Sequence, residues 1–246
     1  MRWIAVAVLA LFACQPVPRE EPVATSALPS SELAPTPGTN TSPPVSGRKS
    51  YLGREIAPTM SHEGAGWLTR PEREQEEQAS RMLKELGLRT GQVACDLGAG
   101  NGYHTLEMGK IVAPEGRAVA VDIQPEMLAL LTERARAAKV TNVETILGDM
   151  ADPKLPASSC DLVLMADVYH ELDDPAAMLA QIKLALKPEG SLALLEFRAD
   201  DPAVPIKPEH TMSAAQMDKE LTHNGFRLVR AFDGLPWQHL RFYSPR

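Results

Sequence analysis

This sequence of 246 residues lacks several features that would assign it to a particular class of protein. It has no excess of basic residues, because 25 Lys and Arg stand against 32 Asp and Glu, and the net charge of −7 argues against binding to nucleic acid. Its six histidines show no metal-ligand spacing with a cysteine or a second histidine, so we expect no metal site. The apolar fraction of 44% is ordinary for a globular chain of one or two domains.

The amino terminus has the pattern of an export signal. Arg2 precedes an apolar run, Trp3 to Ala13, that is too short to cross a bilayer as a mature helix. Leu11-Phe12-Ala13-Cys14 resembles a bacterial lipobox, in which a lipidated cysteine becomes the new amino terminus, although Phe12 stands where a smaller residue is usual. The resemblance implies a signal peptide over residues 1–14, a lipid anchor on Cys14, and a membrane-attached protein on the periplasmic side of the cell envelope. The alternatives are an ordinary cysteine within a signal peptide and, if the leader is misread, a cytoplasmic protein.

Residues 15–50 are rich in proline, serine and threonine and hold almost no large apolar side chain. Such a segment cannot bury enough surface to offset its ordering entropy, so we expect a disordered tether before a folded domain over residues 51–246. Within that domain, residues 51–68 are interrupted by glycines and are interpreted as a cap over a ligand site. Cys95 and Cys160 are expected at opposite ends of a sheet, too far apart for a disulfide, and are interpreted as small core residues.

The stretch from Val93 to Gly102, V-A-C-D-L-G-A-G-N-G, is the most informative in the chain. Its apolar start predicts a buried parallel strand that contains Asp96 and ends in a tight turn into a helix. Glycines at 98, 100 and 102 would let the backbone take positive φ and a ligand approach closely. A dinucleotide-binding G-x-G-x-x-G motif would need glycine where Tyr103 stands, which disfavours a nicotinamide oxidoreductase. A glycine turn without a ligand is the other alternative.

Further strands follow at regular intervals. Arg117 to Ile123 contains Asp122 near its end, so we expect both acids at the carboxyl ends of neighbouring parallel strands, where open α/β sheets bind ligands. Gly148-Asp149-Met150 follows a strand over 143–147, and Asp167, Tyr169 and His170 follow a strand over 161–166. With a closing antiparallel pair over 226–232 and 237–243, the pattern predicts an α/β fold. We expect a doubly wound Rossmann-like sheet, mostly parallel, with an antiparallel strand near the C-terminus.

These motifs, in this order, resemble those of the class I S-adenosylmethionine-dependent methyltransferases from Thr69 to Tyr243. The resemblance implies S-adenosyl-L-methionine as the cofactor and is greatest to the small-molecule enzymes of the quinone and arsenite methyltransferase kind. Asp122 would hold the ribose, although an acid that caps the following helix is its alternative role. The residues that the resemblance assigns to the cofactor are Asp96, Gly98, Gly100, Gly102, Asp122, Ile123, Asp149, Met150 and Asp167.

The catalytic candidates are His170 and the adjacent Tyr169, which follow the fourth strand. Methyl transfer from a sulfonium needs chiefly alignment, and a base is required only if the acceptor is protonated. A histidine that packs against the Asp173-Asp174 turn is the alternative. We therefore expect a methyltransferase that acts on a small or lipid-like acceptor. The alternative is an exported lipoprotein that keeps the cofactor fold for a binding or structural role, since the cofactor is made in the cytoplasm.

The sequence also predicts the helices. Thr69-Arg70-Pro71-Glu72 has capping-box spacing and predicts one helix that ends at Gly87, with the acidic run 72–77 on its solvated face. Helices are also expected over 103–112 and 124–139, and a helix from Ser213 to Asn224.

Overall fold

The computed structural model describes residues 49–246, so the predicted signal peptide, the lipid anchor on Cys14 and nearly all of the tether lie outside the described residues. Seven strands form one sheet in the order β5-β4-β3-β6-β7-β9-β8. The strands from β5 to β7 are parallel, whereas β9 runs antiparallel to both of its neighbours. The strands are β3 (Val93–Leu97), β4 (Arg117–Asp122), β5 (Val143–Leu147), β6 (Cys160–Ala166), β7 (Leu186–Phe197), β8 (Phe226–Phe232) and β9 (Gln238–Pro245).

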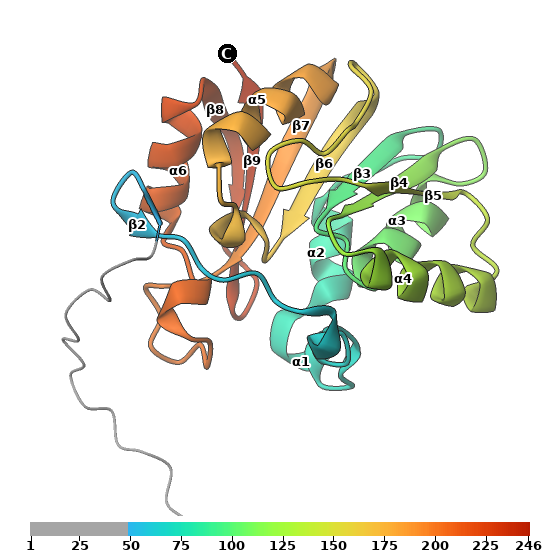
Figure 1. Cartoon of the computed structure of the whole chain (residues 1–246), viewed down its shortest axis with the longest axis horizontal. Helices are drawn as coiled ribbons and strands as arrows, with labels where there is room; N and C mark the ends of the chain where they lie inside the picture. Colours follow the sequence, from blue (N-terminus) through green and yellow to red (C-terminus); the bar gives the residue numbers. More distant parts are fainter. Residues whose placement is uncertain (1–48) are drawn as a thin grey trace, which may run out of the picture. The chain divides into compact units, whose positions relative to one another are not determined.

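Helices cover both faces of this sheet, and a small hairpin precedes them (Figure 1). The hairpin consists of β1 (Ser50–Tyr51) and β2 (Arg54–Glu55). The α-helices are α1 (Arg73–Glu77), α2 (Ala79–Glu85), α3 (Tyr103–Val112), α4 (Pro125–Ala138), α5 (Pro175–Ala185) and α6 (Ala214–His223). Short 3₁₀ turns are η1 (His62–Gly64), η2 (Trp67–Thr69), η3 (Tyr169–Glu171) and η4 (Pro208–His210). None of the helices in residues 49–246 is long and apolar enough to cross a membrane.

The hydrophobic core is divided by the sheet into two layers. Side chains of α5 and α6 pack on one face, against alternate residues of the parallel strands such as Val163 and Met165. Side chains of α2 and α3 pack on the other face, against the intervening residues such as Leu162 and Leu164. Because alternate residues of a strand point to opposite faces, a strand buried on both sides must be apolar throughout, as β6 largely is. The prediction of a doubly wound, mostly parallel sheet is confirmed.

Most element predictions are confirmed, but the helix after Thr69 is wrong. The chain forms two short helices, α1 and α2, because Gln78 between them adopts a left-handed conformation with φ of 52°. The acidic run was also expected on a solvated face, yet Glu77 is only 2% exposed. Its carboxylate accepts hydrogen bonds from Arg70 and Arg73, so two guanidinium groups neutralise it inside the protein.

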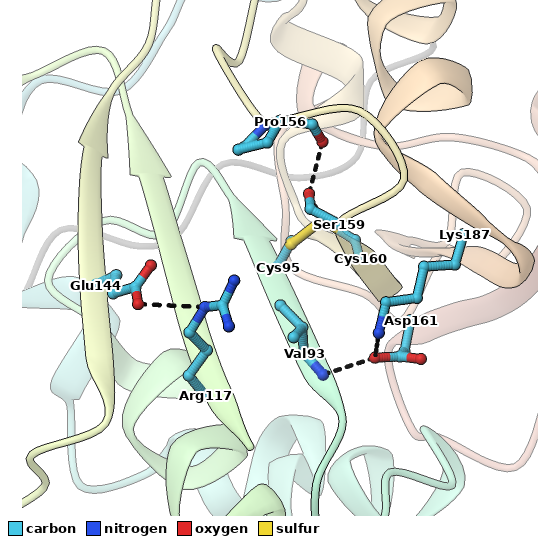
Figure 2. The surroundings of a disulfide bond; sticks show 9 residues. All are labelled: Val93, Cys95, Arg117, Glu144, Pro156, Ser159, Cys160, Asp161 and Lys187. Carbon is cyan, nitrogen blue, oxygen red and sulfur yellow. Dashed lines mark hydrogen bonds and ion pairs between the residues drawn. A yellow bond between two sulfur atoms is a disulfide. The ribbon is translucent and has the colours of Figure 1, made fainter. Parts of the chain in front are cut away.

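The prediction that Cys95 and Cys160 are too far apart for a disulfide is also wrong. The two residues form a disulfide with their Cα atoms 6.0 Å apart, and Figure 2 shows it between β3 and β6. Cys95 lies in the middle of β3 rather than at its carboxyl end, and the two strands are direct neighbours. Cys160 precedes Leu162, the first residue of β6 that pairs with β3, so the register of the two strands does not fix its distance from Cys95. Both cysteines are fully buried, as expected of core residues.

Residues 56–72, between β2 and α1, form a crossing segment that passes over the carboxyl ends of the central strands, seen as the blue trace in Figure 1. Its backbone is attached to η3, because the Ala57 N–H donates to the His170 carbonyl. It is also attached to α4, where the Gln124 side chain bonds both the Met60 carbonyl and the His62 N–H. These bonds hold the segment over the sheet edge at which the predicted site residues stand.

Candidate functional site

A cavity of about 640 Å³ lies at the carboxyl ends of the parallel strands. That volume is within the range of about 300–1,000 Å³ typical of sites for small molecules and cofactors. Residues of the crossing segment and of the loop before α6 form its other walls. Eight of the residues expected from the sequence to form a site line this cavity, namely Gly98, Gly100, Asp122, Ile123, Asp149, Met150, Asp167 and His170. Asp96, Gly102 and Tyr169 are not among the lining residues.

The glycine turn after β3 is packed so tightly that a Cβ atom on any of its three glycines would lie under 3.0 Å from a neighbouring side chain. A Cβ atom on Gly98 would lie 2.5 Å from a methyl carbon of Val168, and one on Gly100 would lie 2.7 Å from a methyl carbon of Leu68. Both glycines also have positive φ, at 69° and 53°. The turn therefore places bare backbone against the cavity, as a closely bound ligand requires.

Asp122 connects the glycine turn to the next strand. Its carboxylate accepts from the Gly100 N–H at 2.8 Å and from the Gln124 N–H at 2.9 Å. Burial raises the pKa of Asp122, while these backbone hydrogen bonds oppose the rise. A carboxylate oxygen has two lone pairs, so this side chain can still accept hydrogen bonds from hydroxyl groups of a ligand in the cavity.

Asp96 lies behind the turn, without lining the cavity. It is 2% exposed, and its Oδ2 accepts from the hydroxyl of Thr105 at 2.5 Å. Burial raises its pKa to about 7, with a smaller contribution from the charge of Asp122. The bond to Thr105 attaches the first turn of α3 to β3, so Asp96 acts on the glycine turn through the position of that helix.

Sequence reasoning missed a buried ion pair in the cavity wall. Arg73 and Glu77 both line the cavity, and the Arg73 Nε donates to Glu77 Oε2 at 2.8 Å. Arg73 also donates to the Leu68 carbonyl and to the ring of His104. The acidic composition of residues 72–77 predicted a solvent-exposed face instead of this pair. The pair faces inward because α1 ends at the left-handed residue Gln78. The spacing of Arg73 and Glu77, four residues apart, was the available signal.

Asp167 directly follows β6 and has an unusual conformation. Its φ is 56°, in a region that a residue with a side chain rarely adopts. Gln238 donates to its Oδ2 at 2.8 Å, but its Oδ1 is buried without a hydrogen-bond partner. Burial raises its pKa well above the ordinary range, and the nearby carboxylates of Glu77 and Glu196 add to the rise. Strained backbone and an unpartnered polar atom in a cavity wall are typical of a ligand site.

His170 is held by a carboxylate on one side and by a second histidine on the other. Its Nδ1 donates to Glu196 Oε2 at 2.5 Å, and its Nε2 lies 3.1 Å from His210 Nδ1. Burial lowers the pKa of His170, but the charges of Glu196 and Glu171 more than offset this and raise it overall. Burial also raises the pKa of the neighbouring Glu171 to about 7.

Tyr169 has a different environment from its neighbour. It is fully buried in the core beneath α5, and the Arg54 guanidinium lies over its ring at 5.5 Å. Burial raises the pKa of its hydroxyl group, and the nearby carboxylate of Glu220 adds to the rise. The structure therefore brings His170 to the cavity but not Tyr169, because successive residues of η3 point in different directions.

Comparisons with known proteins agree with this geometry. A family model described as a methyltransferase domain matches residues 88–238. Demethylmenaquinone methyltransferase from Staphylococcus aureus is 29% identical over 126 residues, 51% of this chain and 51% of that protein. Protein-L-isoaspartate O-methyltransferase from Ignicoccus hospitalis is 30% identical over 103 residues, 42% of this chain and 48% of that protein. The chain thus spans about half the length of these curated relatives.

Among solved structures, the fold is similar to that of a SAM-dependent methyltransferase from Aquifex aeolicus. The two chains are 25% identical with a TM-score of 0.71, and the match covers 75% of this chain and 98% of the other. With more than half of its length matched by the family model, this chain belongs to the methyltransferase domain family and has the class I, Rossmann-like fold of S-adenosylmethionine-dependent methyltransferases.

Proposed function

We propose that this protein transfers a methyl group from S-adenosylmethionine to a small, largely apolar acceptor. The observation that carries the proposal is one cavity that combines a side-chain-free glycine turn, the Asp122 carboxylate and the unpartnered Oδ1 of Asp167. A cofactor with ribose hydroxyls and an amino group supplies a hydrogen-bond donor for Oδ1 of Asp167 and further donors for the Asp122 carboxylate. The residues present therefore fit the cofactor.

The cavity wall suggests how each part of the cofactor is held. We assign the ribose to Asp122, and the adenine to the wall of Ile123, Asp149 and Met150. We assign the charged methionyl end to the region of Gly98, where the acids Asp167 and Glu77 can accept from its ammonium group and Arg73 can attract its carboxylate. Asp96 and Gly102 support this region from behind. When bound, the cofactor supplies a sulfonium methyl group that is open to in-line attack.

The acceptor side of the cavity is apolar and adaptable. Methionine has a flexible, polarizable side chain that fits irregular ligands, and outside the adenine wall the lining contains Met60, Met127, Met165 and Met178. Such a wall suits a flat or lipid-like acceptor. The relative named as a demethylmenaquinone methyltransferase makes a quinone-like acceptor a reasonable first candidate. The net charge of −7 argues against a nucleic-acid acceptor.

We propose that His170 is the catalytic residue for an acceptor that carries a proton. Glu196 accepts from Nδ1, so Nε2 carries the lone pair of the neutral ring and can take a proton from the acceptor. Loss of a well-placed base typically lowers turnover by about 10²–10⁴-fold. His170→Ala should therefore reduce turnover and leave cofactor affinity near the parent value. Equal turnover would assign His170 to packing alone. Tyr169, which is buried in the core, is proposed to anchor η3 and thereby to position His170.

We further propose that the protein is exported and attached to the membrane through Cys14. The buried Cys95–Cys160 disulfide supports this, because structural disulfides persist mainly in oxidising compartments outside the cytoplasm. Membrane fractionation of the parent and of Cys14→Ser tests the proposal. Release of the variant into the soluble fraction is expected. A parent protein that is found in the cytoplasm with Met1 retained would contradict it.

Calorimetric titration with S-adenosylhomocysteine tests the proposed function. Asp122→Ala should lose about 1.5–3 kcal/mol of binding free energy, the value of hydrogen bonds to a charged acceptor. Asp122→Asn keeps an acceptor for the Gly100 N–H and separates ribose binding from the integrity of the turn. Glu115→Ala, an exposed acid between α3 and β4, is the matched control and should bind like the parent. Unchanged affinity in both Asp122 variants would contradict the ribose assignment, and binding without turnover on any acceptor would favour an exported binding protein.

A further inference from the structure

Three potential metal ligands meet in the cavity wall, from segments that are far apart in the sequence. His170 and Glu171 come from η3, and His210 comes from η4 in the loop before α6. Nε2 of His170 lies 3.1 Å from Nδ1 of His210 and 3.8 Å from Oε1 of Glu171. Nδ1 of His210 lies 3.7 Å from the same Oε1. In the part of the chain that the structure describes, these residues form the one group with this arrangement.

The three distances define a point about 2.1 Å from all three atoms. Bonds from zinc to histidine nitrogen and to carboxylate oxygen are about 2.0–2.2 Å long. A cation at or slightly above this plane would therefore bind all three atoms with little movement of the side chains. Two histidines and one carboxylate are the ligand set of open zinc and non-haem iron(II) sites, whereas magnesium and calcium prefer oxygen ligands alone.

The surrounding residues hold two of the ligands in the required orientation. Glu196, which is fully buried, accepts from His170 Nδ1 and thereby leaves Nε2 to bind a cation. The Met60 N–H donates to Glu171 Oε2 at 3.3 Å and leaves Oε1 facing the histidines. Metal-binding histidines almost always donate their second nitrogen to a carboxylate or carbonyl in this way.

The local charge also favours a cation. The carboxylates of Glu171 and Glu196 lie 3.8 Å and 2.5 Å from ring nitrogens of His170, and neither forms an ion pair with a lysine or arginine among the described residues. Lys207 lines the same cavity but is exposed. Glu196 Oε1 is buried without a hydrogen-bond partner, so the residue that orients His170 has a free acceptor atom next to the three ligands.

We propose that His170, Glu171 and His210 bind one divalent first-row transition-metal ion, of the zinc or iron(II) class, with an open coordination position toward the cavity. That position would take an oxygen of the acceptor, so the acceptor class is a compound with an ionisable hydroxyl or a carbonyl group. This last step rests on the proposed function, whereas the metal site does not. With the cation bound, Nε2 of His170 would be a ligand and would not act as the base; the acceptor hydroxyl would lose its proton to water, and the cation would stabilise the resulting oxygen anion.

Cobalt(II) and zinc titrations of the tag-free, chelator-treated full chain test the metal site. One cobalt(II) ion per chain should bind, with visible absorption bands of nitrogen-ligated cobalt that zinc removes. Glu171→Gln and His210→Ala should weaken binding by at least about 100-fold, and Glu196→Gln by about 10–100-fold as a positioning residue. His223→Ala, an exposed histidine on α6, is the matched control and should bind like the parent.

S-Adenosylhomocysteine binding is measured in the same samples. Retained S-adenosylhomocysteine binding in His210→Ala shows that the variant is folded, so its loss of cobalt would then be due to the missing ligand. Cobalt affinity equal in the parent, Glu171→Gln and His210→Ala, or no cobalt bands at all, would overturn the metal proposal and leave the proposed function intact. Cobalt binding without any S-adenosylhomocysteine binding would contradict the proposed function and leave the metal site.

Discussion

Asp96 should make the free energy of unfolding depend on pH in the neutral range. Its carboxyl group is 2% exposed, and its hydrogen-bond partner is the Thr105 hydroxyl rather than a cation. Burial raises the pKa of Asp96 from 3.8 to about 7. The folded protein therefore holds a proton on this residue at pH values where the unfolded chain has released it.

The sign of the effect follows from this difference. The stability that Asp96 contributes is fully present below about pH 4 and is lost as pH rises to about 7, because the folded state must then ionise a buried acid. One pKa unit corresponds to about 1.36 kcal/mol. Between pH 5 and pH 7, Asp96 should therefore lower the free energy of unfolding by about 2–3 kcal/mol.

Urea unfolding of the parent and of Asp96→Asn, from pH 5 to pH 8, measures this contribution. The asparagine cannot ionise but can still accept from the Thr105 hydroxyl. The stability of the variant relative to the parent should rise by about 2–3 kcal/mol from pH 5 to pH 7 and then level off. Asp173→Asn, which changes an exposed acid paired with Lys49, should give a constant offset instead. Parallel curves for Asp96→Asn and the parent would refute the reasoning.

Two further predictions concern the disulfide and the glycine turn. Replacing Cys95 and Cys160 by alanine, or reducing the disulfide, should lower the free energy of unfolding by about 2–5 kcal/mol, because the bond closes a loop with a sequence separation of 65. A melting temperature that reductant does not change would contradict this. Gly98→Ala should lower the free energy of unfolding by at least about 1 kcal/mol and abolish S-adenosylhomocysteine binding, because the new Cβ atom meets Val168 in a backbone of positive φ. Gly66→Ala, with open space at its Cβ position, is the control. Equal affinity of the two variants in calorimetry would disprove the close packing.

The sheet and one edge of the site could be predicted because each depends on local patterns. A continuous apolar run predicts a strand buried on both faces, and β3, β4 and β6 were found in this way. Parallel strands place their carboxyl ends on one edge, so polar residues that follow them, such as Asp122 and Asp167, meet in one cavity.

The disulfide, the inward position of Glu77 and the contact between His170 and His210 could not be predicted, because they depend on irregular backbone that no sequence pattern indicates. Cys160 precedes the residues of β6 that pair with β3, so strand register alone did not give its distance from Cys95. The inward turn of Glu77 depends on the left-handed conformation of Gln78, which no propensity indicates. His210 reaches His170 from 40 residues away through a loop without regular periodicity, so the histidine spacing predicted no metal site.

One cavity, at the carboxyl ends of the parallel strands, is proposed to hold the cofactor. A crystal structure of the full chain with S-adenosylhomocysteine is the decisive measurement. We expect density for the ligand in this cavity, with its ribose hydroxyls donating to Asp122, its amino group donating to Asp167, and its sulfur on the side that faces His170. An empty cavity at saturating ligand, or ligand bound elsewhere on the chain, would show that the cavity is not the cofactor site.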